Sequence, residues 1–183
     1  MQIRHNRATY EGPHMTFLDA ASPEPGSHEP IKPSATRVLR QFRVVFNAVK
    51  THFQQVEKQA GIGGAQVWAL SVVQANPGIG VGELAKAMDI HQSTASNLVK
   101  ALVSRQMLST SRDAEDRRAV CLSVSESGLA VLAAAPAPFA GVLPDALNAL
   151  DDATLARLDN DLERLIKVLG GDAAAAQTPL APL

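Results

Sequence analysis

The stretch HQSTASNLVKALVS (residues 91–104) changes character halfway along its length. Short polar side chains fill its first half, whereas Leu98, Val99 and Leu102 follow in its second half. This spacing places the apolar residues on one helical face and predicts a helix that is buried mainly in its later turns. The polar residues expected to share the opposite, exposed face are Gln92, Ser93, Ser96, Asn97 and Lys100, with Thr94 at its boundary.

The segment GELAKAMDI (82–90) predicts a short helix immediately before this one. Only one or two residues separate the two helices, which forces the sharp angle of a helix-turn-helix pair. In such a pair the start of the second helix enters the major groove of DNA, where short polar side chains reach base edges and phosphates. The alternative is helix capping, in which Ser93 or Thr94 satisfies free N–H groups. Capping accounts for one hydroxyl, so DNA contact is the favoured interpretation of the whole face.

The residues after the second helix predict a β-hairpin with a charged tip at 113–118. In the run AVCLSV, the residues Val120, Leu122 and Val124 are expected to alternate inward. A hairpin beside a helix-turn-helix forms a wing, and Arg117 or Arg118 at its tip could enter the narrow minor groove. Asp116 could orient a guanidinium through a bidentate pair. The alternative is a solvated charged turn.

Long amphipathic helices are expected on both sides of this unit. Apolar residues recur at three and four positions over residues 35–60, and Leu39 and Phe46 widen the stripe as in a dimer interface, although packing within one subunit would give the same pattern. Helices are also predicted over 66–76, 125–135, around FAGVL, and over 151–169, the last with Asp151 or Asp152 at its start and Gly170 after its end. Three prolines, Pro136, Pro138 and Pro144, should break the region between the last two long helices.

Composition narrows the classes of function. A chain of 183 residues with 46% hydrophobic and 4% aromatic residues suits one domain of packed helices. The lone Cys121 cannot form an internal disulfide, His52 has no partner at metal-ligand spacing, and no apolar run reaches membrane-spanning length. We find no catalytic grouping and no dinucleotide fingerprint. The expectation is therefore a soluble, cytoplasmic protein that is not an enzyme and has no membrane segment, metal or cofactor.

The runs ELAKAMDIHQSTASNLVKAL and DRRAVCLSVSESG together resemble the winged helix-turn-helix of the MarR (multiple antibiotic resistance regulator) family of bacterial transcription factors. Asp116, Arg118 and Gly128 match the wing signature of that family. The resemblance implies a mainly α fold with a small β-hairpin wing, assembled as an obligate homodimer. The resemblance covers the folded domain over 36–170, whereas the proline-rich composition of 1–35 predicts a disordered or loosely attached arm and residues 171–183 are expected to form a flexible tail. Within the domain, dimerisation helices would cover about 36–60 and 125–170, and the DNA-binding lobe about 64–124.

The resemblance further implies a function. The dimer would bind a pseudo-palindromic double-stranded DNA operator as a repressor, with Arg118 in the minor groove and Asp116 orienting it. The major groove would be met by Ser93, Thr94, Ser96, Asn97 and Lys100. A small aromatic carboxylate or phenolic effector would release the DNA, with Phe42, Arg43, Phe46 and Trp68 as candidate ligand residues. The alternative function is a winged-helix module that binds another protein and not DNA.

Overall fold

The computed structural model describes residues 31–112 and 120–181. Over these residues the chain is mainly helical, with one two-stranded antiparallel hairpin, which confirms the predicted fold class. The elements in chain order are α1 (Pro33–Ala60), α2 (Gly64–Ala75), α3 (Val81–Ala87), α4 (Gln92–Ser104), β1 (Leu108–Arg112), β2 (Val120–Val124), α5 (Glu126–Ala134), α6 (Val142–Asn148), α7 (Asp152–Leu169) and a 3-10 helix, η1 (Ala173–Gln177). No described helix is both long enough and apolar enough to cross a bilayer.

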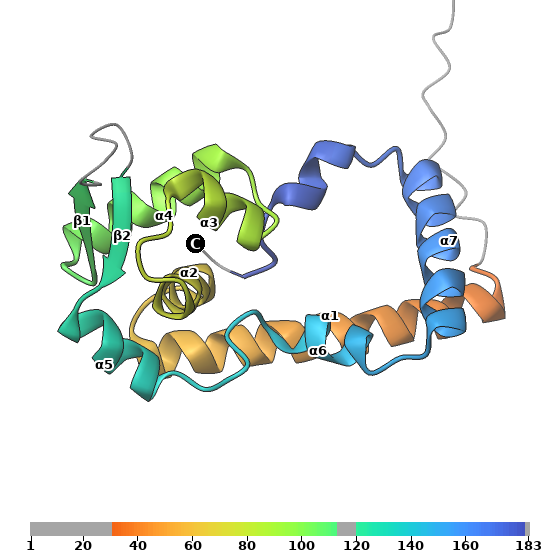
Figure 1. Ribbon diagram of the computed structural model, residues 1–183. Helices are drawn as coiled ribbons and strands as arrows, with labels where there is room; N and C mark the ends of the chain where they lie inside the picture. The colour runs from red at the N-terminus through yellow and green to blue at the C-terminus, as the bar shows by residue number, and fades with distance from the viewer. Residues whose placement is uncertain (1–30, 113–119, 182–183) are drawn as a thin grey trace, which may run out of the picture.

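Helix α1 forms the base of the molecule (Figure 1). The lobe formed by α2, α3, α4 and the hairpin lies over its C-terminal half, and α7 stands near its N-terminal end. Helix α1 ends where Gly61 adopts the left-handed conformation, at φ 71°, and donates its N–H to the Glu57 carbonyl. Glycine reaches this conformation without steric cost, so GIGG ends the helix as its composition predicts.

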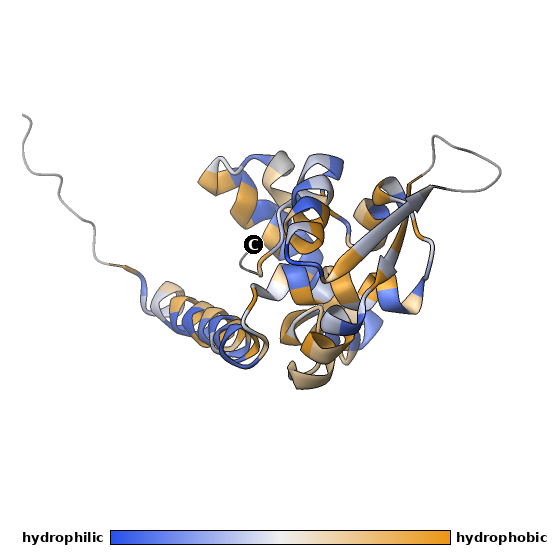
Figure 2. Ribbon diagram, turned by 90° about the vertical axis from the view of Figure 1, so that its left-hand side faces the viewer, coloured by the Kyte–Doolittle hydropathy of each residue, from blue (hydrophilic) through white to orange (hydrophobic). Residues whose placement is uncertain are grey.

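The lobe contains the hydrophobic core, and the ribbons of its helices carry many hydrophobic positions (Figure 2). Leu70 of α2, Leu84 of α3, Leu102 of α4 and Leu122 of β2 are fully buried. Burying a leucine side chain stabilises a fold by about 1.5–3 kcal/mol. These side chains therefore hold the two helices of the helix-turn-helix against the wing.

The wing is attached to the lobe through its second strand. Leu122 donates its N–H to the Ile79 carbonyl and accepts a hydrogen bond from the Gly78 N–H, so the loop before α3 pairs with β2. The predicted inward alternation is correct for Leu122 but wrong for Val120, which is 43% exposed. Val120 pairs with Arg112 at the tip end of the hairpin, whereas Leu122 faces the core of the lobe.

The turn from β2 into α5 is a close-packed corner. Ser125 caps α5 by accepting the Gly128 N–H, and its hydroxyl donates to the Gln106 carbonyl at 2.6 Å. The Ser125 N–H donates to the Met107 carbonyl at 3.1 Å. A Cβ at Gly128 would collide with that same carbonyl oxygen. Gly128 is thus required by the approach of two backbone segments at the base of the wing.

The proline-rich region breaks the C-terminal helices, as predicted. Helix α5 ends at Ala134, and Pro136 and Pro138 lie in the connection to α6. The buried His52 side chain of α1 donates from Nε2 to the Pro138 carbonyl at 2.9 Å, which ties this connection to the base helix. Pro144 does not break a helix but lies in the first turn of α6, where a missing N–H costs no hydrogen bond.

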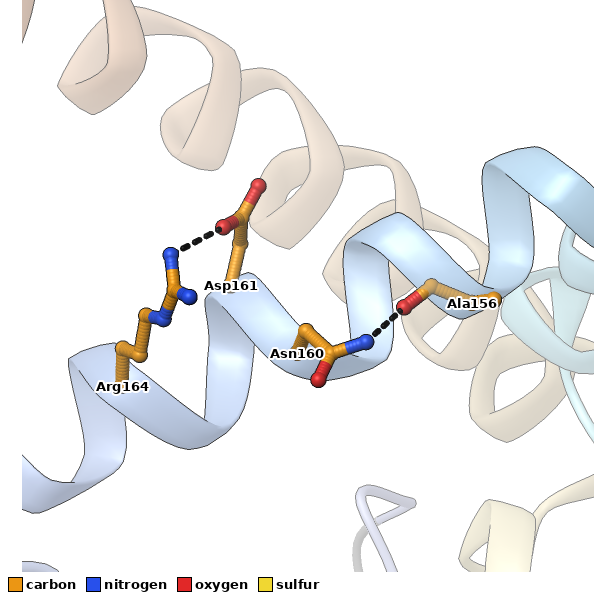
Figure 3. A network of polar contacts seen from close by, with 4 residues as sticks. All are labelled: Ala156, Asn160, Asp161 and Arg164. Carbon is orange, nitrogen blue, oxygen red and sulfur yellow. Dashed lines mark hydrogen bonds and ion pairs between the residues drawn. The ribbon is translucent and has the colours of Figure 1, made fainter.

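Helix α7 is supported mainly by contacts along its own length. Asp151 caps it by accepting the Thr154 N–H at 2.9 Å, and Gly170 ends it in the left-handed conformation. Asn160 donates to the Ala156 carbonyl, and Arg164 lies 3.7 Å from Asp161 (Figure 3). No residue of α7 is buried in the single chain, so little tertiary packing holds this helix in place.

The residues beyond the predicted domain behave in two ways. The expected arm over 1–35 lies mostly outside the described residues, but residues from Pro33 onward are already helical. The segment after Gly170, expected to be a flexible tail, is mostly exposed but contacts the lobe near its end. Its 3-10 helix is followed by Ala181, which is only 6% exposed. The segment is rich in alanine and carries no charge after Asp172, so the contact at Ala181 buries no charged group.

Candidate nucleic-acid interface

The α3–α4 turn has the geometry of a helix-turn-helix. Met88 caps α3 by donating its N–H to the Leu84 carbonyl, and Asp89 then adopts a positive φ of 50°. Aspartate is among the few residues with a side chain that tolerate this conformation. Ile90 turns back into the core and is 7% exposed, and α4 begins two residues later at Gln92.

Helix α4 separates its two faces as the sequence predicts. Ala95, Leu98, Val99 and Leu102 are buried. The side chains of Gln92, Ser93, Asn97 and Lys100 are exposed. Thr94 and Ser96 are half-buried, and the Ser96 hydroxyl donates to the Gln92 carbonyl at 2.8 Å. The Ser96 hydroxyl therefore donates its hydrogen bond within the helix, and its oxygen can still accept one.

Side-chain capping does not explain the polar start of α4. The N-cap residue is His91, whose side chain makes no capping hydrogen bond to the helix. The first turn contains no acidic residue. A helix start of this kind presents N–H groups and a positive dipole end, and both favour a phosphate group.

Exposed basic side chains flank this face. Lys86 of α3, Lys100 of α4 and Arg105 after α4 are all exposed. Arg105 also donates to the Gly61 carbonyl at 3.5 Å, which orients it back toward the end of α1. The acidic residues nearest in sequence, Glu83 and Asp89, lie before α4 and not on its exposed face. The local charge thus suits phosphate although the whole chain has a net charge of −1.

The tip of the wing lies outside the described residues. Asp116, Arg117 and Arg118 all belong to 113–119. The two strands that carry the tip are paired in register from Leu108 with Val124 to Arg112 with Val120. The position of the predicted minor-groove arginine therefore remains a prediction from the sequence.

A cavity of about 430 Å³ lies between the lobe and the base helix. Val49 and Phe53 of α1, Trp68 of α2 and Leu143 of α6 contribute to its mostly apolar lining. Of the four candidate ligand residues predicted from the sequence, Trp68 alone lines this cavity.

The other three candidates lie nearer the start of α1 than the turns of that helix that line this cavity. Phe42 and Phe46 stack on each other, with ring centroids 6.2 Å apart, and Phe46 is 64% exposed. At 1.5 Å per residue, Phe46 lies about 10 Å along the helix from Phe53, beyond the reach of the lobe. Arg43 is exposed on the same part of α1. The apolar periodicity of α1 does not show which of its turns the lobe covers.

Comparisons with known proteins agree with this geometry. The winged helix-turn-helix class is defined by α3, α4 and the hairpin. Residues 60–119 match a family model described as MarR family. No curated protein sequence matches the chain. The predicted resemblance to the MarR family is therefore confirmed over the DNA-binding lobe. This is a family of transcription regulators and not of enzymes, as expected from the sequence.

Solved structures extend the likeness to the fold of most of the chain. A MepR-like protein complexed with pseudoligands is 16% identical, with a TM-score of 0.51 over 77% of this chain and 100% of its own. The S. aureus MepR bound to DNA is 19% identical, with a TM-score of 0.50 over 73% of this chain and 96% of its own. At these identities the likeness shows the fold alone.

Proposed function

We propose that the protein is a DNA-binding transcriptional regulator that acts as a homodimer in the cytoplasm and represses transcription from a pseudo-palindromic operator. The observation that carries this proposal is the exposed polar face of α4 within a lobe that matches the MarR family. Gln92, Ser93 and Asn97 would read base edges in the major groove, and Lys100 would contact a phosphate. Thr94 and Ser96 lie at the edge of this face, where their hydroxyl oxygens would accept hydrogen bonds or help to position the helix on the DNA.

A second copy of the chain is the partner that the exposed apolar surface requires. Three large apolar side chains are exposed. Phe46 of α1 is 64% exposed, and Ile166 and Leu169 of α7 are 50% and 72% exposed. Large apolar patches on a soluble protein mark interaction surfaces. Since α7 has no buried residue in one chain, we attribute its stability to packing against the partner in the dimer. Two recognition helices related by a twofold axis would bind two half-sites of one operator.

The wing would add a minor-groove contact. Arg118 would enter the groove, Asp116 would orient the guanidinium, and Arg117 would contact the backbone. The ordered strands β1 and β2 support this role, because they project from the lobe beside α4 (Figure 1).

A small aromatic effector would bind in the cavity between the lobe and α1. Trp68 and Phe53 offer faces for stacking an aromatic ring. Asp89 is the ionisable side chain among the described lining residues, and Arg43 lies elsewhere. A phenolic group, which needs no cationic partner, therefore suits this cavity better than a carboxylate. Asp89 also belongs to the turn of the helix-turn-helix, so an effector here would touch the segment that positions α4.

DNA affinity measured at several salt concentrations tests the proposal. The full chain should bind a fragment of DNA flanking its own gene, and affinity should fall steeply as salt rises, because phosphate contacts release counterions. Lys100→Ala should weaken binding to all sequences and reduce the salt slope by about one. Asn97→Ala should instead reduce discrimination between operator and random DNA. Lys50→Ala is the matched control, since Lys50 is exposed on α1, away from α4.

The alternative function predicts a different result. A winged-helix module that binds only another protein would show no salt-dependent affinity for any duplex. In that case Arg118→Ala and the wild type would show the same affinity for duplex DNA. Loss of affinity in Arg118→Ala with an intact dimer would support the minor-groove contact.

A further inference from the structure

The C-terminal segment returns from α7 to the DNA-binding lobe. After Gly170 the chain forms the 3-10 helix Ala173–Gln177 and then runs along the lobe to Ala181 (Figure 1). The Gln177 carbonyl accepts the His91 N–H at 3.3 Å. His91 is the N-cap residue of α4, so the segment contacts the first residue of the predicted recognition helix.

The end of the segment lies in a closely packed site, called the seat, which is formed by Gly64, Gly141 and the Phe53 ring around Ala181. Ala181 is 6% exposed, and its Cβ lies 3.3 Å from the position that a Cβ at Gly64 would take. The Phe53 ring fills the rest of that space and also prevents a side chain at Gly141. At position 181, a side chain larger than that of alanine would have to displace the Phe53 ring or the start of α2. Small residues at 64, 141 and 181 are thus matched to one another across three parts of the chain.

The same segment forms one wall of the apolar cavity. Thr178, Pro179 and Ala181 line it together with Val49 of α1 and Trp68 of α2. Without residues 172–181, the cavity would be open to solvent along this wall. The composition of the segment agrees with a covering role, since DAAAAQTPLAPL carries no charge after Asp172 and is poor in the polar residues typical of a solvated tail.

We propose that residues 172–181 act as an intramolecular strap that closes the cavity and ties α7 to the start of α4. An apolar molecule enters the cavity when the strap leaves its seat, and the bound molecule then competes with the seated strap. Closure of the cavity is independent of any DNA contact. The strap also holds the N-cap residue of α4, and any effect of its release on DNA binding by α4 rests on the proposed function.

Two variants and one control test the strap: a chain that ends at Gly171, the full-length variant Ala181→Asp and the full-length control Ala175→Asp. Ala181→Asp places a carboxylate in the buried seat and should displace the strap without shortening the chain. Ala175→Asp makes the same exchange at an exposed position of the 3-10 helix and is the matched control. The probe is N-phenyl-1-naphthylamine, a neutral dye that fluoresces in apolar surroundings.

If the strap covers the cavity, the truncated chain and Ala181→Asp should bind the dye more tightly than the wild type. An occluded cavity lowers apparent affinity by the fraction of open molecules, so an increase of roughly threefold or more is expected. Trp68, the only tryptophan in the sequence, should also become more accessible to quenching by acrylamide. Ala175→Asp should match the wild type in both measurements.

Three results would overturn the proposal. The first is equal dye affinity in the wild type, the truncated chain and Ala181→Asp. The second is an equal effect of Ala175→Asp and Ala181→Asp. The third is loss of helical circular dichroism on truncation, because the segment would then belong to the folding core and could not leave its seat. A wild-type protein that binds no DNA would refute the proposed function but would leave the dye and quenching results valid as a test of the strap.

Discussion

Gly128→Ala tests whether the wing is anchored at its base by close backbone packing. The added methyl group would collide with the Met107 carbonyl oxygen and would lie 2.7 Å from Cγ1 of Val124. The carbonyl cannot withdraw freely, because it accepts the Ser125 N–H at 3.1 Å. Because the collision is with backbone that cannot move freely, the overpacking cost lies in the upper part of the usual range, at about 2–3 kcal/mol. Alanine recovers up to about 1 kcal/mol through its higher helix propensity, so the expected net loss is about 1–2 kcal/mol.

Thermal unfolding followed by circular dichroism at fixed protomer concentration measures this loss. For a chain of this size, 1 kcal/mol corresponds to about 2–4 °C in Tm, so Gly128→Ala should lower Tm by about 2–8 °C. Gly82→Ala is the matched control. Gly82 lies in the first turn of α3, and the nearest atom to its added Cβ is Nε2 of Gln92 at 4.0 Å. Helix propensity should act alone there, so Tm should stay constant or rise.

A higher Tm in both variants would refute this reasoning, because it would show that the methyl group at 128 finds open space. The wing would then be free to move relative to α5. Equal losses in both variants would also contradict it, since they would point to a general intolerance of alanine at the glycine positions and not to the corner at the base of the wing.

Three further predictions concern the rest of the molecule. Phe53→Ala should lower the free energy of unfolding by about 3–5 kcal/mol, measured by chemical denaturation, because the ring fills a space shared by three segments; a loss below 1 kcal/mol would contradict the seat. The double variant Leu165→Asp and Ile166→Asp should be monomeric by analytical ultracentrifugation, since both side chains are exposed on α7 in the single chain; a dimer would place the interface elsewhere. The Thr154 hydroxyl and N–H hydrogen bonds hold the pKa of Asp151 below its ordinary value of 3.8, so this cap should stabilise the fold above that pH and lose its effect as pH falls through the lowered pKa. The difference in Tm between wild type and Asp151→Ala should accordingly be larger at pH 7 than at pH 2.5, and a constant difference would show that the ionised cap is not responsible.

The helices and their boundaries could be predicted where the physics is local. Gly61 and Gly170 end α1 and α7 in the left-handed conformation, and Asp151 caps α7 through its own side chain. These effects depend on residues within one turn of one another, so the order of amino acids is sufficient to predict them. The polar face of α4 is equally local, because its spacing sets which side chains share a side of the helix.

The candidate ligand site could be predicted only in part. Trp68, one of the four candidate ligand residues, lies on a short, strongly apolar helix and lines the cavity, and its role in ligand binding stays a prediction. Phe42 and Phe46 have the same periodicity as Phe53, yet the lobe covers Phe53 alone. Periodicity shows that a face is apolar, but it does not show which turns of a long helix are covered, and by what.

The helix-turn-helix, its polar face, the hairpin and the proline break could all be predicted from the order of amino acids, because each follows from neighbouring residues. Contacts in the folded chain set where the cavity lies, why position 128 must be glycine and that the last ten described residues return to the lobe. These features depend on contacts between segments far apart in the chain, such as Ala181 with the space beside Gly64. Such contacts are set by the shape of the packed elements, and no local pattern of residues contains that shape.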